Sequence, residues 1–171
     1  TSYGKQIIER RKLFTAQLNE IIYGIHKKLS GGKEELVIRY EPDEETEGFE
    51  NALERARERD IRMKITSVGP HRDDFAFLID GIDVRKYGSQ GQQRSCVLAL
   101  KLAEAALLAE ALGEKPVILL DDVMSELDAS RQDYLLNKIQ GWQVFITCCE
   151  DDRLPQLLGG RIFHVKNGTV R

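Results

Sequence analysis

The sequence has few of the features that mark secreted, membrane-spanning or metal-stabilised proteins. Only 3 of its 171 residues are cysteine, and the adjacent pair Cys148 and Cys149 is typical of reduced cytosolic thiols rather than of a disulfide framework. The 3 histidines have no partner at metal-ligand spacing. There is no secretory signal segment, and no apolar run approaches the roughly 18 residues that cross a bilayer. We therefore expect a cytoplasmic protein without membrane contact.

An excess of positive charge is also absent. The 25 Lys and Arg residues stand against 28 Asp and Glu residues, which gives a formal net charge of -3. A free-standing duplex-DNA binder usually carries a basic surface, so any contact with DNA must be local or come from other residues or a second subunit. The hydrophobic share of 42% and the charged share of 31% still fit a folded, globular chain.

A third absence concerns nucleotide binding. The sequence contains no Gly-x-x-x-x-Gly-Lys-Ser/Thr, the glycine-rich loop with which many ATPases hold phosphates. The nearest match, Gly31-Gly32-Lys33, follows a helix instead of a buried strand, and no hydroxyl-bearing residue comes next. These glycines are better explained as a helix end. The chain by itself is therefore not expected to cradle the phosphates of ATP.

Hydrophobic periodicity predicts an α/β fold. The first helix, of about seven turns, has a stripe formed by Ile7, Phe14, Leu18, Ile21, Ile25 and Leu29. Further helices are predicted at 49–61, 90–112, 130–139 and 154–158, and strands at 36–40, 75–79, 82–84, 117–120, 144–147, 162–165 and 169–170. The continuous apolar runs at 117–120 and 144–147 fit strands that are buried on both faces of a parallel sheet.

Two carboxylates follow the apolar run 117–120. Asp121 and Asp122 thus lie at the carboxyl end of a predicted strand, where α/β proteins place their ligands. The first carboxylate suits Mg²⁺ held through water opposite nucleotide phosphates, and the second can orient or deprotonate an attacking water. The pattern is that of a Walker B motif. Taken alone, it is equally compatible with a strand that ends in a polar turn.

A helix start follows shortly after these carboxylates. Residues Ser125–Asp128 read Ser-Glu-Leu-Asp, and Asp128 or Ser130 can cap the next helix. The D-loop of an ABC-type ATPase head has the same form and lies at the dimer interface. The two interpretations do not exclude each other.

Small and polar residues also introduce the long helix 90–112. From Gly88 to Arg94 they read Gly-Ser-Gln-Gly-Gln-Gln-Arg. Free backbone N–H groups, the positive end of the helix dipole and the Ser89 hydroxyl together make an anion site. The simpler alternative, an N-cap by Ser89, accounts for the serine but not for the residues that follow it.

In order and spacing these three motifs resemble the C-terminal half of an ABC-type ATPase head, and their residues resemble the RecF family. The resemblance is carried by Gly69-Pro70-His71-Arg72-Asp73-Asp74, Tyr87–Arg94, Leu98–Glu104, Leu119–Val123 and Ser125–Asp128. It implies a helical arm or second-lobe segment at residues 1–65 and the C-terminal half of the head at residues 66–171.

The resemblance also implies a biological role. A RecF-type protein would bind gapped or double-stranded DNA as a homodimer that forms on ATP binding, with ATP and Mg²⁺ as cofactors. It would help RecO- and RecR-type partners to load the recombinase RecA. Roles in DNA replication, recombination, repair and the SOS response, and a nucleoid-associated location, are implied in the same way.

Carried over residue by residue, the resemblance assigns three groups of site residues. The signature motif, which would contact the γ-phosphate of ATP on the other subunit, consists of Ser89, Gln90, Gly91 and Gln92. Asp121 would serve Mg²⁺, Asp122 would be the catalytic carboxylate, and Ser125 and Asp128 would belong to the D-loop.

Three departures from the common pattern point to a slow ATPase. Gln90 replaces the first glycine of the signature motif. Asp122 stands where most relatives have the longer Glu. Cys148 occupies the position of the switch histidine of ABC transporters.

Two other interpretations stay open. The chain can be a non-enzymatic module that docks a partner such as RecR, or part of the head of another repair ATPase of the SMC class. Nucleotide titration of the full-length protein separates a docking module from an ATPase. For His71 and Arg72, contact with nucleotide or DNA and an ion pair with Asp73 or Asp74 agree about equally well with the sequence.

Overall fold

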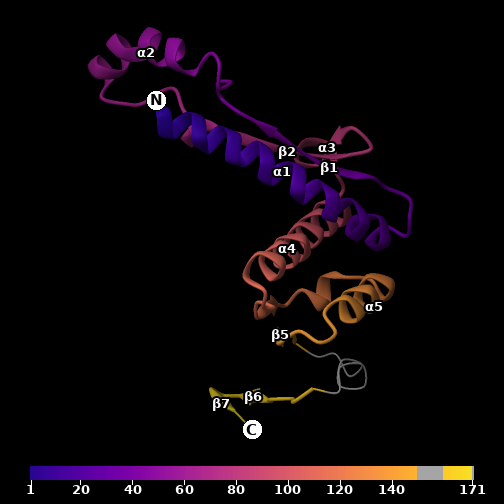
Figure 1. Ribbon diagram of the computed structural model, residues 1–171. Coiled ribbons are helices and arrows are strands. Elements are labelled where there is room, and N and C mark those ends of the chain that lie inside the picture. The colour runs from indigo at the N-terminus through magenta and orange to yellow at the C-terminus, as the bar shows by residue number, and fades with distance from the viewer. Residues whose placement is uncertain (150–159, 171) are drawn as a thin grey trace. The chain divides into compact units, whose positions relative to one another are not determined.

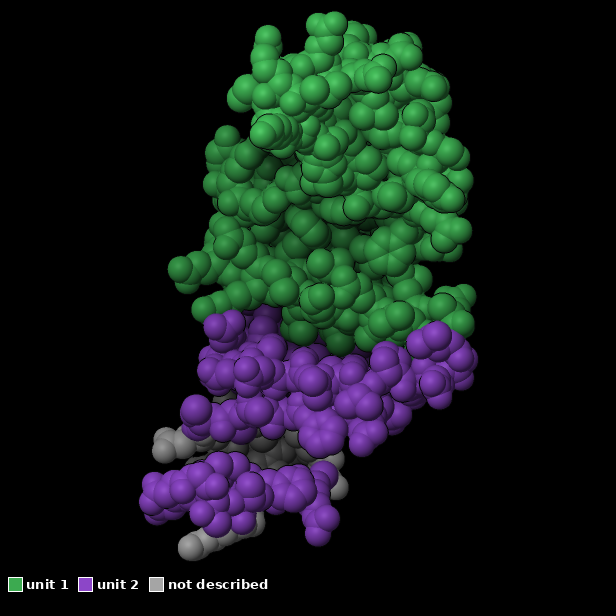
Figure 2. Space-filling model, turned by 90° about the vertical axis from the view of Figure 1, so that its left-hand side faces the viewer, with its two compact units in different colours: residues 1–111 green, residues 112–171 purple. Residues whose placement is uncertain are grey.

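The computed structural model describes residues 1–149 and 160–170, and the chain divides into two compact units, residues 1–111 and residues 112–171 (Figure 2). Helices and strands are mixed along the chain, and the second unit contains a parallel strand pair. The predicted α/β fold class is therefore confirmed. Among the described residues, no helix is both long and apolar enough to cross a membrane.

The first unit is built on a three-stranded antiparallel sheet of order β1-β2-β3, with the long helix α1 packed against it (Figure 1). Its elements are α1 (Ser2–Leu29), β1 (Leu36–Glu41), α2 (Phe49–Met63), a 3₁₀ turn (Pro70–Arg72), β2 (Asp74–Ile79), β3 (Ile82–Asp83), α3 (Val84–Tyr87) and α4 (Gln90–Leu112). The bounds of α4 are those predicted from the sequence.

Helix α1 buries a face that differs from the predicted stripe towards its N-terminus. Ile25 and Leu29 are buried as predicted, but Ile7 and Phe14 are 41% and 44% exposed. Ile8 is buried in place of Ile7. A helix of 3.6 residues per turn drifts against a seven-residue spacing, so an adjacent apolar pair does not reveal from sequence which member faces the core.

One side-chain amide attaches α1 to the edge strand β1. Asn19 Nδ2 donates to Ile38 O at 2.7 Å, and Asn19 Oδ1 accepts from Ile38 N at 2.8 Å. The other edge of β1 pairs with β2. Asn19 therefore satisfies backbone groups that an edge strand otherwise leaves to water.

The predicted hairpin between β2 and β3 is confirmed. Its turn residues Asp80 and Gly81 have φ angles of +50° and +81°, the left-handed backbone for which Asp-Gly is favoured in two-residue turns. The returning strand is shorter than predicted, since it ends at Asp83 and Val84 begins α3. The reason is local, because Asp83 Oδ1 accepts from Arg85 N at 2.9 Å and caps a helical turn.

The second unit contains a parallel strand pair connected through a helix, as parallel strands require. Its elements are β4 (Ile118–Asp121), a 3₁₀ turn (Met124–Glu126), α5 (Ala129–Lys138), β5 (Val144–Thr147) and the hairpin strands β6 (Val165–Lys166) and β7 (Thr169–Val170). Residues 162–164, which were expected to be strand, are not part of one. The helix expected at 154–158 lies outside the described residues.

One face of the β4–β5 pair is exposed, so the expectation of burial on both faces is wrong for the described residues. Leu119 and Phe145 are partners across the two strands and are 74% and 55% exposed. Leu120, on the opposite face of β4, is 7% exposed. Parallel sheets are normally covered on both sides; in the part of the chain that the structure describes, this one is covered on a single side.

Candidate functional site

Helix α4 begins at a point where the chain has room only for glycine. A Cβ atom at Gly88 would lie 2.6 Å from Val84 O and 2.8 Å from Val84 Cγ1. Gly88 N donates to Val84 O at 3.0 Å and closes α3 directly before Ser89. Gly88 therefore lets the chain pass directly from α3 into α4. Ser89 is the only residue between Gly88 and the start of α4.

Ser89 and Gln92 form a reciprocal cap on α4. Ser89 Oγ accepts from Gln92 N at 3.2 Å, and Gln92 Oε1 accepts from Ser89 N at 2.9 Å. This capping box satisfies two of the N–H groups that a helix start leaves without partners. The N-cap interpretation of Ser89 is therefore confirmed as geometry. It does not exclude an anion ligand, because the hydroxyl is the acceptor here and keeps its own hydrogen for donation.

The glutamines of the motif are held by contacts outside the first turn. Gln93 Nε2 donates to the carbonyl oxygens of Val84 and Gly88, both at 3.2 Å. Gln92 Nε2 donates to Glu34 Oε1 at 2.9 Å. These contacts explain why amide side chains follow Ser89, which an N-cap alone does not.

The start of α4 has the properties of an anion site. Ser89 and Gln90 are exposed, and the first turn of this 23-residue helix contains no acidic residue. The N-terminal N–H groups and the helix dipole therefore favour a negatively charged ligand there. A phosphate fits this set of donors.

Asp121 and Asp122 lie at the carboxyl end of β4, as predicted, and both are exposed. Thr147 is the partner of Asp121 across the sheet and donates its hydroxyl to Asp121 Oδ1. The same Thr147 Oγ1 accepts from Asp122 N at 3.1 Å. One hydroxyl group therefore orients the carboxylate of Asp121 and the backbone of Asp122.

Asp122 has a left-handed backbone with a φ of +51°. Asp adopts this conformation more readily than most residues other than glycine. Asp122 N also donates to Thr147 O at 3.1 Å, and Asp122 O accepts from Ser125 Oγ at 2.9 Å. The turn after β4 is thus fixed on both sides of Asp122, while the Asp122 carboxylate remains exposed.

Asp128, and not Ser130, is the N-cap of α5. Asp128 Oδ1 accepts from Arg131 N at 3.0 Å, and Asp128 Oδ2 pairs with Arg131 Nη1 at 2.9 Å. Ser125 and Asp128 are both exposed. A capping role and a role at a subunit interface remain compatible for Asp128.

The part of the chain that the structure describes contains no group of three or more His, Cys, Asp or Glu side chains arranged to hold a metal. Asp121 and Asp122 are two adjacent exposed carboxylates at the end of β4. This arrangement suits Mg²⁺, which commonly takes one or two carboxylates and completes its shell with water and phosphate oxygens. A site of this kind needs the nucleotide as part of the ligand set.

The predicted site residues belong to two different units. The first unit contains the signature residues Ser89, Gln90, Gly91 and Gln92, and the second unit contains Asp121, Asp122, Ser125 and Asp128. Within the first group Ser89 contacts Gln92, and within the second Asp122 contacts Ser125.

The loop before β2 surrounds Asp73, whose side chain is 1% exposed. Asp73 accepts hydrogen bonds from the Arg11 guanidinium, from the Tyr40 hydroxyl and, at 3.0 Å, from Asp43 N. Burial and the hydrogen bond to Asp73 raise the pKa of Tyr40 to about 12. This cluster ties α1, β1 and the loop together, and its chemistry is structural.

His71 and Arg72 make local contacts in the same loop. His71 Nε2 lies 2.9 Å from Thr66 O, and Arg72 Nε lies 3.8 Å from Asp43 Oδ1. Arg72 therefore pairs with Asp43, and not with Asp73 or Asp74, which the sequence had suggested as partners. These contacts favour the structural interpretation of both residues over contact with nucleotide or DNA.

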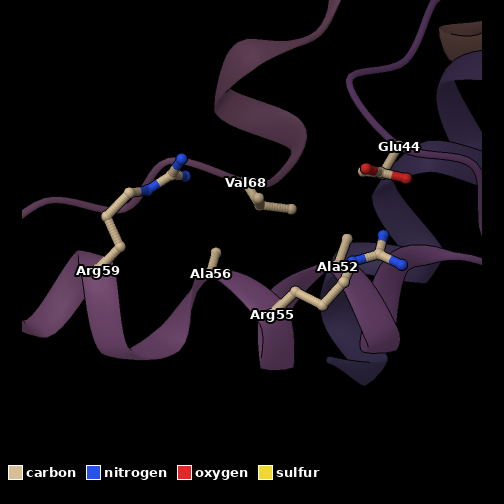
Figure 3. A pocket seen from close by; sticks show the side chains of 6 residues that line it. All are labelled: Glu44, Ala52, Arg55, Ala56, Arg59 and Val68. Carbon is tan, nitrogen blue, oxygen red and sulfur yellow. The ribbon is translucent and has the colours of Figure 1, made fainter.

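A shallow hollow of about 230 Å³ lies against α2 (Figure 3). It is lined by Glu44, Ala52, Arg55, Ala56, Arg59 and Val68, and contains none of the predicted site residues. Figure 3 shows Val68 over the helix face that carries Ala52 and Ala56. The hollow is explained by a loop that packs on the small side chains of a helix.

Sequence reasoning missed two residues that contact the candidate site, Thr147 and Glu34. Thr147 had a usable signal, because it is the polar end of an apolar strand expected to lie beside β4 in parallel. Glu34 had none, since it contacts Gln92 across 58 residues of sequence.

No protein-family model matches the sequence. The curated proteins that are similar to this chain share one name. The chain is 48% identical over 170 residues to "DNA replication and repair protein RecF" of Agathobacter rectalis, and 51% identical over 170 residues to the protein of the same name of Lachnoclostridium phytofermentans. Each alignment covers 98% of this chain and 47% of the relative. The chain thus spans about half the length of the curated relatives it matches.

Two solved structures have the same fold over nearly all of the chain. One is described as "Structure of the recombination mediator protein RecF-ATP in RecFOR pathway", with a TM-score of 0.80 and 37% identity over 99% of this chain and 47% of that chain. The other is its counterpart with ATPrS, with a TM-score of 0.79 and 39% identity over 98% of this chain and 47% of that chain.

Proposed function

Because this chain belongs to the RecF family of DNA replication and repair proteins and matches about half of a member's length, we propose that it forms the C-terminal part of an ATP-dependent recombination mediator. In the full-length protein, ATP binding drives dimerisation on DNA. The proposal is supported by one observation above all. The exposed Ser89 hydroxyl stands at the N-terminus of α4 within a capping box that leaves its hydrogen available.

Ser89, Gly91 and Gln92 act on the nucleotide of the neighbouring subunit. The N-terminal N–H groups of α4 and the Ser89 hydroxyl approach the γ-phosphate as donors, and the helix dipole adds to the attraction. Gln90 is exposed beside Ser89 and replaces the first glycine of the signature motif. Its side chain narrows the space through which the γ-phosphate reaches Ser89. Contacts of this kind make ATP a bridge between two subunits and link dimerisation to the presence of the γ-phosphate.

Asp121 and Asp122, at the end of β4, have different roles. Asp121 holds Mg²⁺, whose charge offsets that of the phosphates. Asp122 orients the attacking water and accepts its proton. Thr147 fixes the Asp121 carboxylate and the Asp122 backbone through one hydroxyl, so it positions both. Ser125 and Asp128, in the D-loop, lie at the subunit interface.

The remaining proposals concern organisation and partners. Residues 1–65, which are mostly helical but include the strand β1 that pairs with β2 across this boundary, form a second-lobe segment, and residues 66–171 form the C-terminal half of the ATPase head. The dimer binds gapped or double-stranded DNA, and RecO- and RecR-type proteins are its partners in loading RecA. The RecFOR pathway named for the two solved relatives supports this set of partners.

Sedimentation of the full-length protein tests the central proposal. Wild type and Ser89→Arg are compared with and without ATP, and Ser2→Arg in the exposed first turn of α1 is the matched control. The wild type and the control should dimerise with ATP. Ser89→Arg should stay monomeric yet bind ATP with nearly unchanged affinity, because arginine fills the space that a phosphate needs.

Two other results have clear meanings. If Ser89 serves only as an N-cap, Ser89→Arg should lower stability by about 1 kcal/mol and leave ATP-driven dimers intact. If the full-length wild type neither binds ATP nor dimerises, the chain belongs to a docking module and the proposed function is wrong.

A further inference from the structure

Glu34 contacts the signature motif from a distant part of the sequence. It lies in the turn between α1 and β1, and its Oε1 accepts from Gln92 Nε2 at 2.9 Å. Its side chain is only 22% exposed. A half-buried carboxylate with a specific amide partner is unlike the neighbouring Glu35, which is exposed.

The backbone around Glu34 is firmly placed. Glu34 N donates to Ser30 Oγ at 3.3 Å. The next residue, Glu35, exchanges two hydrogen bonds with Asp80 of the hairpin turn, Glu35 N to Asp80 Oδ1 and Asp80 N to Glu35 O, both at 3.0 Å. The second carboxylate oxygen of Glu34 lies 3.9 Å from Nε2 of His26, which is completely buried. Glu34 is therefore a fixed acceptor.

A fixed acceptor determines which way the Gln92 amide faces. A carboxylate only accepts hydrogen bonds, so the NH₂ group of Gln92 must face Glu34. The amide oxygen then faces Ser89 N, from which it accepts at 2.9 Å. With its N–H satisfied by Gln92, Ser89 has its hydroxyl positioned by the return bond from Gln92 N at 3.2 Å.

We infer that Glu34 is a positioning residue of the signature motif, which acts through the Gln92 amide to hold the Ser89 hydroxyl ready for a phosphate. The inference rests on the proposed role of Ser89 in binding ATP of the neighbouring subunit. Glu34 itself contacts no nucleotide. Loss of its carboxylate frees the Gln92 amide to rotate and weakens the capping box at the point where the phosphate approaches.

The test uses full-length protein in five variants besides wild type. Glu34→Ala removes the acceptor. Glu34→Gln keeps a carbonyl oxygen that can accept the same hydrogen bond. Glu35→Ala is the matched control, because the neighbouring Glu35 side chain contacts Tyr23 at 3.1 Å and not the signature motif. Gln92→Ala, alone and combined with Glu34→Ala, measures the coupling between the two residues.

Three quantities are measured for each variant: ATP affinity of the monomer, the ATP concentration at half-maximal dimerisation, and the thermal unfolding midpoint. Glu34→Ala should raise the ATP concentration for dimerisation by roughly tenfold, the usual scale for losing a hydrogen bond to a charged group. Monomer affinity should be unchanged. Glu34→Gln should recover most of the loss, Glu35→Ala should match wild type, and Glu34→Ala should add little to Gln92→Ala.

Normal ATP-driven dimerisation of Glu34→Ala, in a series where Ser89→Arg fails to dimerise, would overturn this inference and leave the proposed function standing. A purely structural role would also overturn it. That role would appear as a lower unfolding midpoint and equal losses in monomer affinity and dimerisation, without rescue by Glu34→Gln. If wild type does not dimerise with ATP, the proposed function and this inference fail together.

Discussion

The Thr147 hydroxyl serves two neighbouring acidic residues through one oxygen atom. It donates to the Asp121 carboxylate and accepts from Asp122 N. Valine has the same shape but supplies neither bond. At this scale the candidate site depends on single polar atoms whose partners come from another strand.

Asp122→Asn separates nucleotide binding from hydrolysis. Asn also tolerates the left-handed backbone at this position, so the turn after β4 should keep its conformation. In the full-length protein, ATP binding should persist while hydrolysis falls roughly 10²-fold or more, the usual scale for losing a general base. Steady-state turnover and dimer lifetime measure the effect. Normal hydrolysis by this variant would show that Asp122 is not the catalytic carboxylate.

Tyr40→Phe tests the buried cluster around Asp73. The folded-state pKa of Tyr40, about 12, lies above its ordinary value of 10. The stabilisation linked to this shift is therefore complete below pH 10 and is lost as the pH rises towards 12. Tyr40→Phe should lower the free energy of unfolding by about 1–3 kcal/mol at neutral pH, and its stability should fall less than that of wild type above pH 10.

Urea unfolding at a series of pH values measures both effects of Tyr40→Phe. Tyr3→Phe is the control, because Tyr3 is 82% exposed. An equal alkaline loss of stability in wild type and Tyr40→Phe would mean that Tyr40 does not hold a raised pKa.

The ends of helices and strands were predicted best where a glycine, a capping residue or a turn sequence marks them. Gly88-Ser89 before α4 and Gly113 after it define a helix whose bounds match the prediction. The hairpin turn Asp80-Gly81 was recognisable for the same reason. Val84 was predicted to lie in a strand, but it begins the short helix α3, because the Asp83 side chain caps that helix. Strand propensity does not reveal such a cap.

Contacts between distant elements were not predictable from the same patterns. Thr147 meets Asp121 across 26 residues, and Glu34 meets Gln92 across 58. No periodicity or local motif encodes these pairs, since they depend on the packed arrangement of whole elements. The sequence thus predicted the candidate site residues, but not the residues that hold them in place.

Asn19→Asp tests how α1 is attached to the sheet. Aspartate can still accept from Ile38 N, but it cannot donate to Ile38 O and places negative charge beside that carbonyl. The free energy of unfolding should fall by about 1–3 kcal/mol. Asn51→Asp on the exposed surface of α2 is the matched control and should change little. Equal stability of the two variants in urea unfolding would show that the Asn19 contacts do not hold β1.

The described residues have an α/β fold, and the chain matches about half the length of its RecF relatives. One face of the parallel strand pair is apolar and exposed, since Leu119 and Phe145 lie on it. Parallel sheets are normally covered on both faces. We expect the remainder of the full-length protein to cover this one.

The chain by itself should not hydrolyse ATP above background. It has a candidate Walker B strand but no glycine-rich phosphate loop in its sequence, so neither the β- nor the γ-phosphate has a cradle. Steady-state turnover of this chain is compared with that of the full-length protein. Turnover by the chain alone that disappears on Asp122→Ala would contradict the prediction.

The left-handed backbone of Asp122 restricts how this position can change during evolution. Single-base changes of an aspartate codon lead to glutamate, which keeps the negative charge, and to asparagine or glycine, which suit the backbone. None of the available substitutions keeps both properties. A change to the longer glutamate keeps the charge but suits the left-handed backbone less well, so aspartate should be favoured here once the turn has formed.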